Sequence, residues 1–331
     1  WIAEFLTACV ARVDQGVAKA WNSDGTIPYT YFTHRPTSYD PIEMFSEGEH
    51  KTIKTNSKGL TCFRVKAFEC IQLPLFLEGP VHYLRCLPDQ QVADSITKSI
   101  RESGLFDQKL KMYKVNESLM DQPMEIGRAR TFSPGWFENE SIWLHMEYKY
   151  MLEILRNGLF DTFYDDFRKV FIPFMDPEVY GRSILENSSF LVSSANPNPG
   201  LHGTGFVARL SGATAEFIQI LIEMTVGSTP FSAAKDGKLN FSVNPALPAW
   251  LFTDKEQTVD IGQHDSLQSH VIPENSFSFM FLGDILISYI NPSQQNTYGE
   301  GSVSPAEWTL YDADGKTQHI KGSSLDHATA L

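Results

Sequence analysis

The spacing of apolar residues changes at about residue 228, and this change constrains the fold more than any other feature of the sequence. Before it, apolar residues such as Phe160, Phe163 and Phe167 recur every three or four positions, as in amphipathic helices. After it, short runs alternate apolar and polar residues, as in strands. The sequence therefore predicts two domains, residues 1–228 and 229–331, in a fold that is mainly α followed by β.

The first domain is expected to consist of helices joined by long loops. Turn-rich, aperiodic sequence at residues 21–58 predicts one such loop, and Asp89 is a predicted helix cap. Paired helices that end at glycines fit half of an (α/α)6 barrel. The predicted helices lie near residues 1–20, 64–70, 89–104, 139–158, 160–170 and 214–225.

The second domain is expected to be a β-sandwich. An Asp312-Ala-Asp-Gly315 turn between two strand-like runs predicts a hairpin. The predicted strands lie at residues 239–243, 276–281, 285–289, 308–311 and 317–320.

Composition excludes several classes of partner. The chain has 331 residues and a formal net charge of −13, and it lacks the clustered Lys and Arg that nucleic-acid binding requires. It also lacks the run of about 18 apolar residues that a membrane span needs. Its four cysteines show no C-x-x-C spacing, so we expect neither a metal site nor a disulfide framework, and a cytoplasmic location. A homodimer is compatible with the sequence.

The chain begins with Trp1 inside an apolar-periodic stretch, without a basic region or a cleavage site. We expect it to be cut from a longer polypeptide.

Residues 126–145 combine polar, glycine and aromatic residues in a way that a core does not require. Pro134-Gly135 predicts a turn, Glu138-Asn139 precedes a predicted helix, and His145 lies in its first two turns. A helix N-terminus with nearby donors favours an anion, although an early-helix histidine is also a common structural residue.

Two further segments share this composition. The first is residues 176–189, which lead into a Ser-Ser-Ala-Asn-Pro-Asn-Pro-Gly run at 193–200. The second is residues 202–214, where Ser211 and Gly212 precede a helix. The hydroxyl and backbone N–H groups at that point fit either a phosphate cradle or a helix cap.

Together these segments resemble the cellobiose-phosphorylase-type glycoside phosphorylases, a glycoside hydrolase family 94-like group. Ser211-Gly212-Ala213 resembles the family's Thr-Gly-(Ser/Thr)-Ala-Gly-Trp turn, and residues 73–80 and 110–116 resemble its long β-oligoglucan phosphorylase branch. The resemblance covers about residues 10–228. The family pattern P-G-x-x-E-N-x-x-x-x-x-H is matched by Pro134, Gly135, Glu138, Asn139 and His145.

The resemblance implies an inverting enzyme that cleaves β-glucosidic bonds of an oligosaccharide or β-glucan by phosphorolysis and releases α-glucose 1-phosphate. Inorganic phosphate would be the co-substrate, with no cofactor and no metal. Phosphate binding would fall to His145, Ser211 and Gly212, and Glu138 would contact the sugar in the acceptor subsite.

Three more charged residues are candidate substrate-binding residues: Glu178, Arg182 and Arg209. Charged side chains among glycines and aromatics at a barrel mouth usually face a ligand, but each of the three also fits a buried ion pair.

The general acid of the family is an aspartate in an Asp-Trp-Asn-Asp-like motif, which this chain lacks. Residues 21–24 echo it only in part, and a turn before Gly25 explains them better. The family spacing places this acid upstream of Trp1, so no catalytic residue is assigned.

Two alternative functions remain open. An inverting hydrolase or a transglycosylase on the same barrel would need a second carboxylate, for which Glu138, Glu178 and Glu186 are available. A non-catalytic carbohydrate-binding protein would need no catalytic carboxylate.

Overall fold

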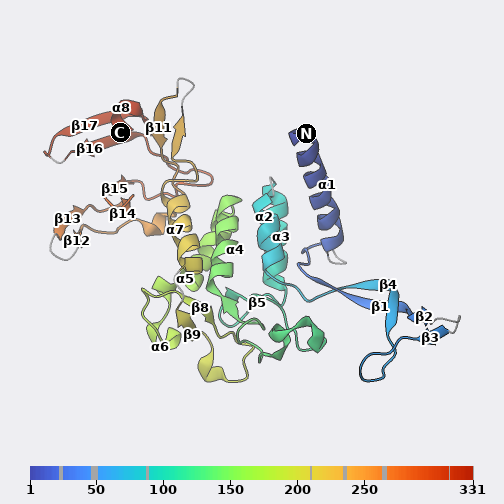
Figure 1. The fold of residues 1–331 in the computed structure, drawn as a ribbon. Coiled ribbons are helices and arrows are strands. Elements are labelled where there is room, and N and C mark those ends of the chain that lie inside the picture. The colour runs from blue at the N-terminus through green and yellow to red at the C-terminus, as the bar shows by residue number, and fades with distance from the viewer. Residues whose placement is uncertain are drawn as a thin grey trace. The chain divides into compact units, whose positions relative to one another are not determined.

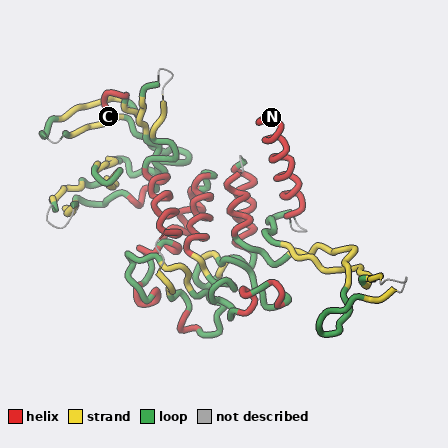
Figure 2. Tube along the Cα trace, viewed as in Figure 1, coloured by secondary structure: helices red, strands yellow, loops and turns green. Residues whose placement is uncertain are grey.

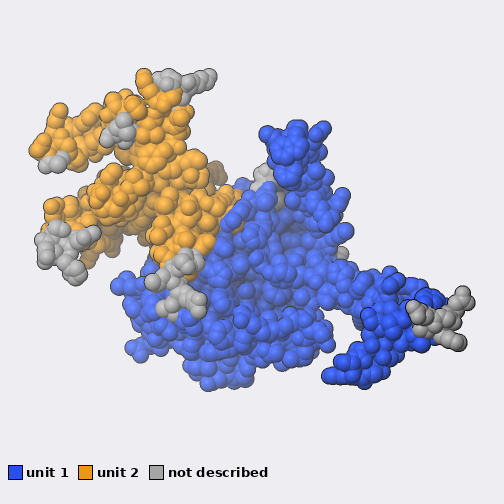
Figure 3. All heavy atoms as spheres, in the orientation of Figure 1, with its two compact units in different colours: residues 1–150, 169–210 blue, residues 151–168, 211–331 orange. Residues whose placement is uncertain are grey.

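The computed structural model describes residues 1–21, 25–45, 51–86, 89–208, 211–233, 237–262, 267–312 and 314–330. The chain forms two compact units (Figure 3). Unit 1 consists of Trp1–Tyr150 and Lys169–Leu210, and unit 2 consists of Met151–Arg168 and Ser211–Leu331. The units are discontinuous in sequence, and the domain boundary between residues 228 and 229 stays a prediction.

The expected half (α/α)6 barrel followed by a β-sandwich is wrong. Of the residues that the structure describes, 33% are helical and 29% are in strands, so the fold is mixed. Helices and strands (red and yellow in Figure 2) are interspersed up to residue 225, and strands β1 to β9 all lie before residue 209. Apolar spacing identified many of the helices but missed short strands whose pairing partners are distant in sequence.

Several helices agree with their predicted positions. Asp89 caps α3 by accepting hydrogen bonds from the backbone of Gln91 and Val92, and α5 has the predicted bounds. Helix α4 begins five residues later than residue 139, because Glu140 has a φ of 61° that no helix accommodates. The α-helices are α1 Ile2–Ala20, α2 Glu78–Cys86, α3 Gln90–Glu102, α4 Leu144–Arg156, α5 Phe160–Val170, α6 Pro177–Tyr180, α7 Ser211–Thr225 and α8 His327–Ala330. Short 3-10 helices lie at Met124–Ile126, Arg128–Thr131, Ile172–Phe174, Pro199–Leu201 and Ala249–Leu251.

A two-stranded ribbon occupies the place of the predicted loop at 21–58 and the predicted helix at 64–70. β1 (Phe32–Pro41) pairs antiparallel with β4 (Phe63–Gln72), and between them along the chain lies the short pair β2 (Glu43–Phe45) and β3 (Lys51–Ile53) (Figure 1). β4 starts with an apolar–polar alternation, which is the two-residue period of a strand. Pairing with β1 satisfies the backbone of this exposed segment and decides against the helix.

Unit 1 has its core around α2, α3 and α4. Their buried faces include Val81, Ile96, Ile100 and Tyr148, and the ring of Tyr148 stacks on Phe171 at 5.1 Å. The remaining strands of this unit form a two-stranded and a three-stranded antiparallel sheet. These strands are β5 Phe106–Asp107, β6 Met112–Tyr113, β7 Ile142–Trp143, β8 Ser188–Leu191 and β9 Gly205–Ala208.

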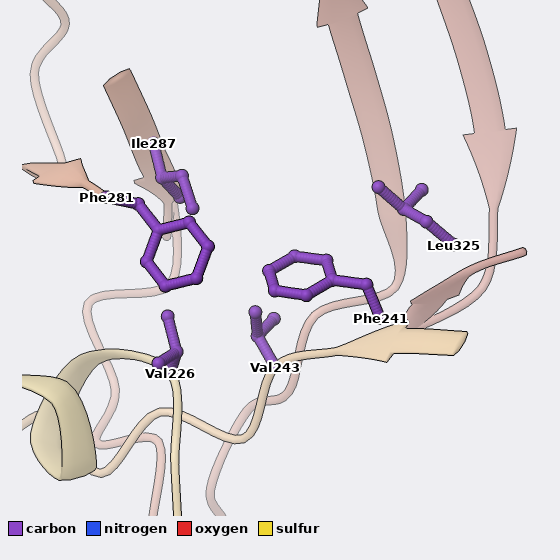
Figure 4. Packing of buried hydrophobic residues seen from close by; sticks show 6 residues of the cluster. All are labelled: Val226, Phe241, Val243, Phe281, Ile287 and Leu325. Atoms are coloured by element: carbon purple, nitrogen blue, oxygen red, sulfur yellow. The ribbon is translucent and has the colours of Figure 1, made fainter. Parts of the chain in front are cut away.

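The predicted strands of unit 2 are confirmed, but they do not form a sandwich. The largest sheet in the described part of this unit has three strands, in the order β10-β11-β18, and the others are hairpins. A small apolar core is formed by Val226, Phe241, Val243, Phe281, Ile287 and Leu325 (Figure 4). The strands are β10 Phe231–Ala233, β11 Leu239–Ser242, β12 Gln257–Ile261, β13 Gln268–Ile272, β14 Ser276–Phe281, β15 Ile285–Ile290, β16 Glu307–Tyr311, β17 Thr317–Lys321 and β18 Ser324–Leu325.

The hairpin of β16 and β17 turns as predicted. The Asp312 carboxylate accepts hydrogen bonds from the backbone of Asp314 and Lys316, at 3.1 and 2.7 Å, which is the local chemistry that makes aspartate a turn residue. Among the described helices, none combines the length and apolarity needed to cross a membrane.

Candidate functional site

The three segments that stand out in the sequence meet in one sheet of unit 1. β7 lies within the first segment, β8 begins at the end of the second, and β9 lies within the third. They pair in the order β7-β8-β9, with Trp143 opposite Phe190 and Phe190 opposite Phe206. The sheet thus brings together segments that are well separated along the chain.

Glu138 lies in a tight turn just before this sheet. The backbone N–H groups of Trp136 and Asn139 each donate to the other residue's carbonyl at 3.2 Å, which leaves Phe137 and Glu138 as the two central residues. Phe137 has a φ of 47°, and Glu140, just after the turn, has a φ of 61°. A non-glycine residue in this left-handed region costs about 1–2 kcal/mol, and such strain often occurs at functional sites.

The turn persists because its neighbours hold it. The carbonyl of Phe137 accepts hydrogen bonds from the Ser141 hydroxyl and from the indole N–H of Trp143, the latter at 2.9 Å. The fully buried amide of Asn139 donates to the Phe132 carbonyl at 2.8 Å and accepts from the Leu119 backbone at 3.2 Å. These bonds offset the strain in the backbone.

The carboxylate of Glu138 is only half satisfied. Its Oε1 accepts from the guanidinium of Arg128, whose side chain is 79% exposed. Its Oε2 is buried and has no hydrogen-bond partner in the described part of the chain. Leaving a buried acceptor unsatisfied costs about 1–3 kcal/mol, more for a charged group. An additional hydrogen-bond donor at this oxygen would therefore stabilise the carboxylate.

Aromatic side chains cluster at the turn that carries Glu138. Trp136 contacts Phe190 and Phe206 edge-on, with ring centroids 5.3 and 4.7 Å apart, and Phe137 lies 4.9 Å from Phe190. Trp136, Phe137 and Phe206 are only partly buried. Partly exposed aromatic rings can contact the apolar face of a polar ligand.

Two glycines allow the close packing of this region. At Gly135, which has a φ of 73°, a Cβ would lie 2.6 Å from the backbone nitrogen of Asn196. At Gly205 in β9, a Cβ would lie 2.5 Å from the ring of Tyr180. Neither position has room for a side chain, so both glycines are required by this arrangement.

His145, a predicted phosphate-binding residue, lies in the first turn of α4. Its ring meets Trp143 edge-on, 5.5 Å between centroids, so it is linked to the Glu138 turn through Trp143. Burial lowers the pKa of the His145 imidazole below its usual range, and the Lys149 ammonium lowers it further; the Glu78 carboxylate acts in the opposite direction. The ring is therefore neutral at neutral pH and offers a hydrogen bond rather than a positive charge.

Glu78 and Tyr31 near this histidine were not singled out as candidate site residues from the sequence. The Tyr31 hydroxyl donates to Glu78 at the start of α2, and His82 lies 3.8 Å from the same carboxylate. The hydrogen bond to Glu78 raises the pKa of Tyr31 to about 12, with smaller contributions from burial and from the charge of the carboxylate. Glu78 lies in the 73–80 segment that carried part of the family resemblance, which is the only signal that pointed to it.

Arg182 and Glu178 have different surroundings. Arg182 forms an ion pair with Glu186 at 3.1 Å and donates to the carbonyl of Gly205 at 2.9 Å. It therefore fits the ion-pair alternative, in a half-buried rather than a fully buried form. Glu178 is exposed on α6.

The positions of the remaining predicted site residues leave the predicted phosphate site untested. Ser211 and Gly212 begin α7 in unit 2, whereas His145 and Glu138 belong to unit 1, so their convergence stays a prediction. Arg209 lies outside the described residues. Within the described ranges, no group of three or more His, Cys, Asp or Glu side chains is arranged to hold a metal ion.

Comparison with known proteins gives no further assignment. No model of a known protein family matches the chain, and no curated protein matches it.

Proposed function

We propose that this chain takes part in the phosphorolysis of β-glucosidic bonds in an oligosaccharide or β-glucan, with inversion and release of α-glucose 1-phosphate. The observation that carries the proposal is the Glu138 carboxylate, which has one buried oxygen without a partner on a strained turn beside partly exposed aromatic rings. A sugar hydroxyl supplies the missing donor, and a pyranose face suits the rings.

In this proposal, Glu138 binds the sugar of the acceptor subsite and His145 binds the inorganic phosphate. Phosphate is itself the nucleophile: its oxygen forms a bond to the anomeric carbon while the bond to the leaving oxygen breaks. The leaving oxygen takes a proton from a general acid, which we assign to no residue of this chain. The neutral His145 ring donates a hydrogen bond to phosphate without removing its charge.

The proposed location is the cytoplasm. Cys9, Cys62, Cys70 and Cys86 are all free, which is typical of proteins in a reducing compartment.

The test supplies the intact protein with sophorose, laminaribiose or cellobiose and measures glucose 1-phosphate with and without added inorganic phosphate. Glucose 1-phosphate that appears only with phosphate supports the proposal. Cleavage that proceeds equally well without phosphate identifies a hydrolase or transglycosylase instead. Binding of these sugars without any cleavage identifies a non-catalytic carbohydrate-binding protein.

A further inference from the structure

Asn116 contacts the Glu138 turn from a separate segment of unit 1. It is fully buried and follows β6 in the chain. Its side-chain amide donates to the carbonyl of Glu138, and its Oδ1 accepts from the backbone N–H of Glu140 at 2.7 Å. The single amide group therefore bridges the two peptide groups on either side of Asn139.

The backbone around Asn116 is itself fixed. The N–H of Val115 donates to the Ser141 carbonyl at 2.8 Å, and the N–H of Glu117 donates to the Leu75 carbonyl at 2.9 Å. Asn116 also forms an antiparallel bridge with Phe76. A side chain on such an anchored backbone can impose a position on the turn that it contacts.

The turn needs such a constraint. Phe137 and Glu140 both have positive φ values, and these would relax toward ordinary backbone conformations without opposing contacts. Asn116 bonds the two peptide groups that set the direction of the chain between Glu138 and Glu140. An aspartate in its place would turn a donor into an acceptor and face the Glu138 carbonyl with a negative charge.

We propose that Asn116 is a positioning residue, which fixes the Glu138 carboxylate for sugar binding without touching the sugar itself. This inference rests on the proposed function of Glu138. A loss of this contact moves the carboxylate away from the sugar but leaves His145 on α4 in place. His145 is linked to the turn through Trp143 at the Phe137 carbonyl, a different peptide group from the two that Asn116 bonds. The apparent constant for the sugar should therefore rise, and that for phosphate should stay the same.

The kinetic experiment compares wild type with Asn116→Asp, Glu138→Ala and the double variant. We expect each single substitution to raise the apparent constant for the oligosaccharide about tenfold or more and to change that for phosphate less than about twofold. The double variant should be no worse than Glu138→Ala, because Asn116 acts through Glu138. Additive losses, or equal losses for sugar and phosphate, would overturn the proposal.

Asn291→Asp is the matched control. Asn291 is also buried and also forms two side-chain hydrogen bonds, to the Gln295 carbonyl and the Ser293 hydroxyl, but it lies in unit 2. It should leave both apparent constants unchanged. A sugar-specific loss in this control would show that the effect of Asn116→Asp is not local.

Amide hydrogen exchange separates this inference from the proposed function. In the wild type, the Glu140 N–H is bonded to a buried acceptor and should exchange slowly. In Asn116→Ala it should exchange at least about tenfold faster. Both proteins are measured at the same interval below their own melting temperatures, so that a difference in global stability does not contribute. Unchanged exchange overturns the positioning role, whatever the enzyme does. Faster exchange in a protein that makes no glucose 1-phosphate would refute the proposed function and leave Asn116 as the residue that orders the turn.

Discussion

Glu138 illustrates, at the scale of single residues, how a site can work against the stability of its own fold. Its turn contains strained backbone, and its Oε2 is buried without a partner among the described residues. Natural sequences keep such local conflicts mainly where a ligand resolves them. The cost in the free protein and the benefit in the complex should therefore be separable by substitution.

Glu138→Ala should weaken oligosaccharide binding about ten- to hundred-fold and leave phosphate binding unchanged, because it removes the proposed hydroxyl acceptor. Its melting temperature should stay the same or rise, because an unsatisfied buried oxygen is lost. Steady-state kinetics and calorimetry measure the two effects. Glu125→Ala, at an exposed glutamate in the neighbouring 3-10 helix, is the control and should change neither. A large loss of stability in Glu138→Ala would mean that this glutamate is structural.

His145 gives a prediction about pH. Burial lowers its pKa in the folded state, so the unfolded chain binds more protons on this ring as the pH falls through about 6.5. The stability that the neutral ring contributes is therefore present above that pH and is lost as the pH falls. His145→Gln should lose less stability than wild type between about pH 7.5 and about pH 5.5. Urea unfolding at both pH values measures this difference; equal losses in the two proteins would contradict it.

At the scale of elements, a buried polar network joins α4 and α7 within unit 2. Arg156, near the end of α4, bonds Glu223 of α7 at 2.9 Å and Glu153 at 3.3 Å. The two carboxylates are 7% and 1% exposed, and the arginine pairs with both of them. The packing of these helices depends on charge as well as on apolar contact.

Arg156→Met should destabilise the protein by about 3 kcal/mol or more, because it removes the cation that pairs with two buried carboxylates. Lys98→Met is the control: Lys98 forms an exposed pair with Asp94 on α3, and its loss should cost less than about 1 kcal/mol. Chemical unfolding measures both. Adding Glu223→Gln to Arg156→Met should recover part of the loss, since one unpaired charge is removed. Equal stability of the two single variants would contradict the prediction.

The elements differ in how far the sequence could predict them. Helix α5 has its full apolar period within 11 residues, so local sequence was sufficient. Strand β4 lies where the sequence predicts a helix, because its stability depends on pairing with β1, which no local pattern encodes. Strand β7 is two residues long and exists only through β8. The half barrel failed for the same reason, since short paired strands separate the helices that it required.

The candidate site divides in the same way. Glu138 and His145 were identified by a local motif, and the structure links their surroundings through Trp143. Asn116 was not singled out as a site residue, because its role depends on backbone groups 22 and 24 residues further along the chain. A buried asparagine gives no local sign of which peptide it holds.

At the scale of the whole molecule, charge is the property that bears on the proposed reaction. The formal net charge is −13, and two cations beside the Glu138 turn are already paired: Arg128 with Glu138, and Lys114 with Glu140 at 2.9 Å. These neutral pairs do little to offset the overall negative field. A phosphate dianion that approaches the protein is therefore repelled at long range, although hydrogen bonds hold it once bound.

Phosphate binding should consequently become tighter, by about two- to fivefold in the apparent constant, when the ionic strength rises from about 0.02 to about 0.2 M. Salt shortens the screening length from about 20 Å to about 7 Å and so weakens the repulsion between the dianion and the acidic protein. The neutral oligosaccharide is an internal control. It carries no charge to be screened, so its apparent constant should stay the same. Kinetics with each substrate varied separately at both salt concentrations measure the two responses. Weaker phosphate binding at high salt would mean that an unpaired local cation dominates the field at the site. The phosphate would then be bound by such a group.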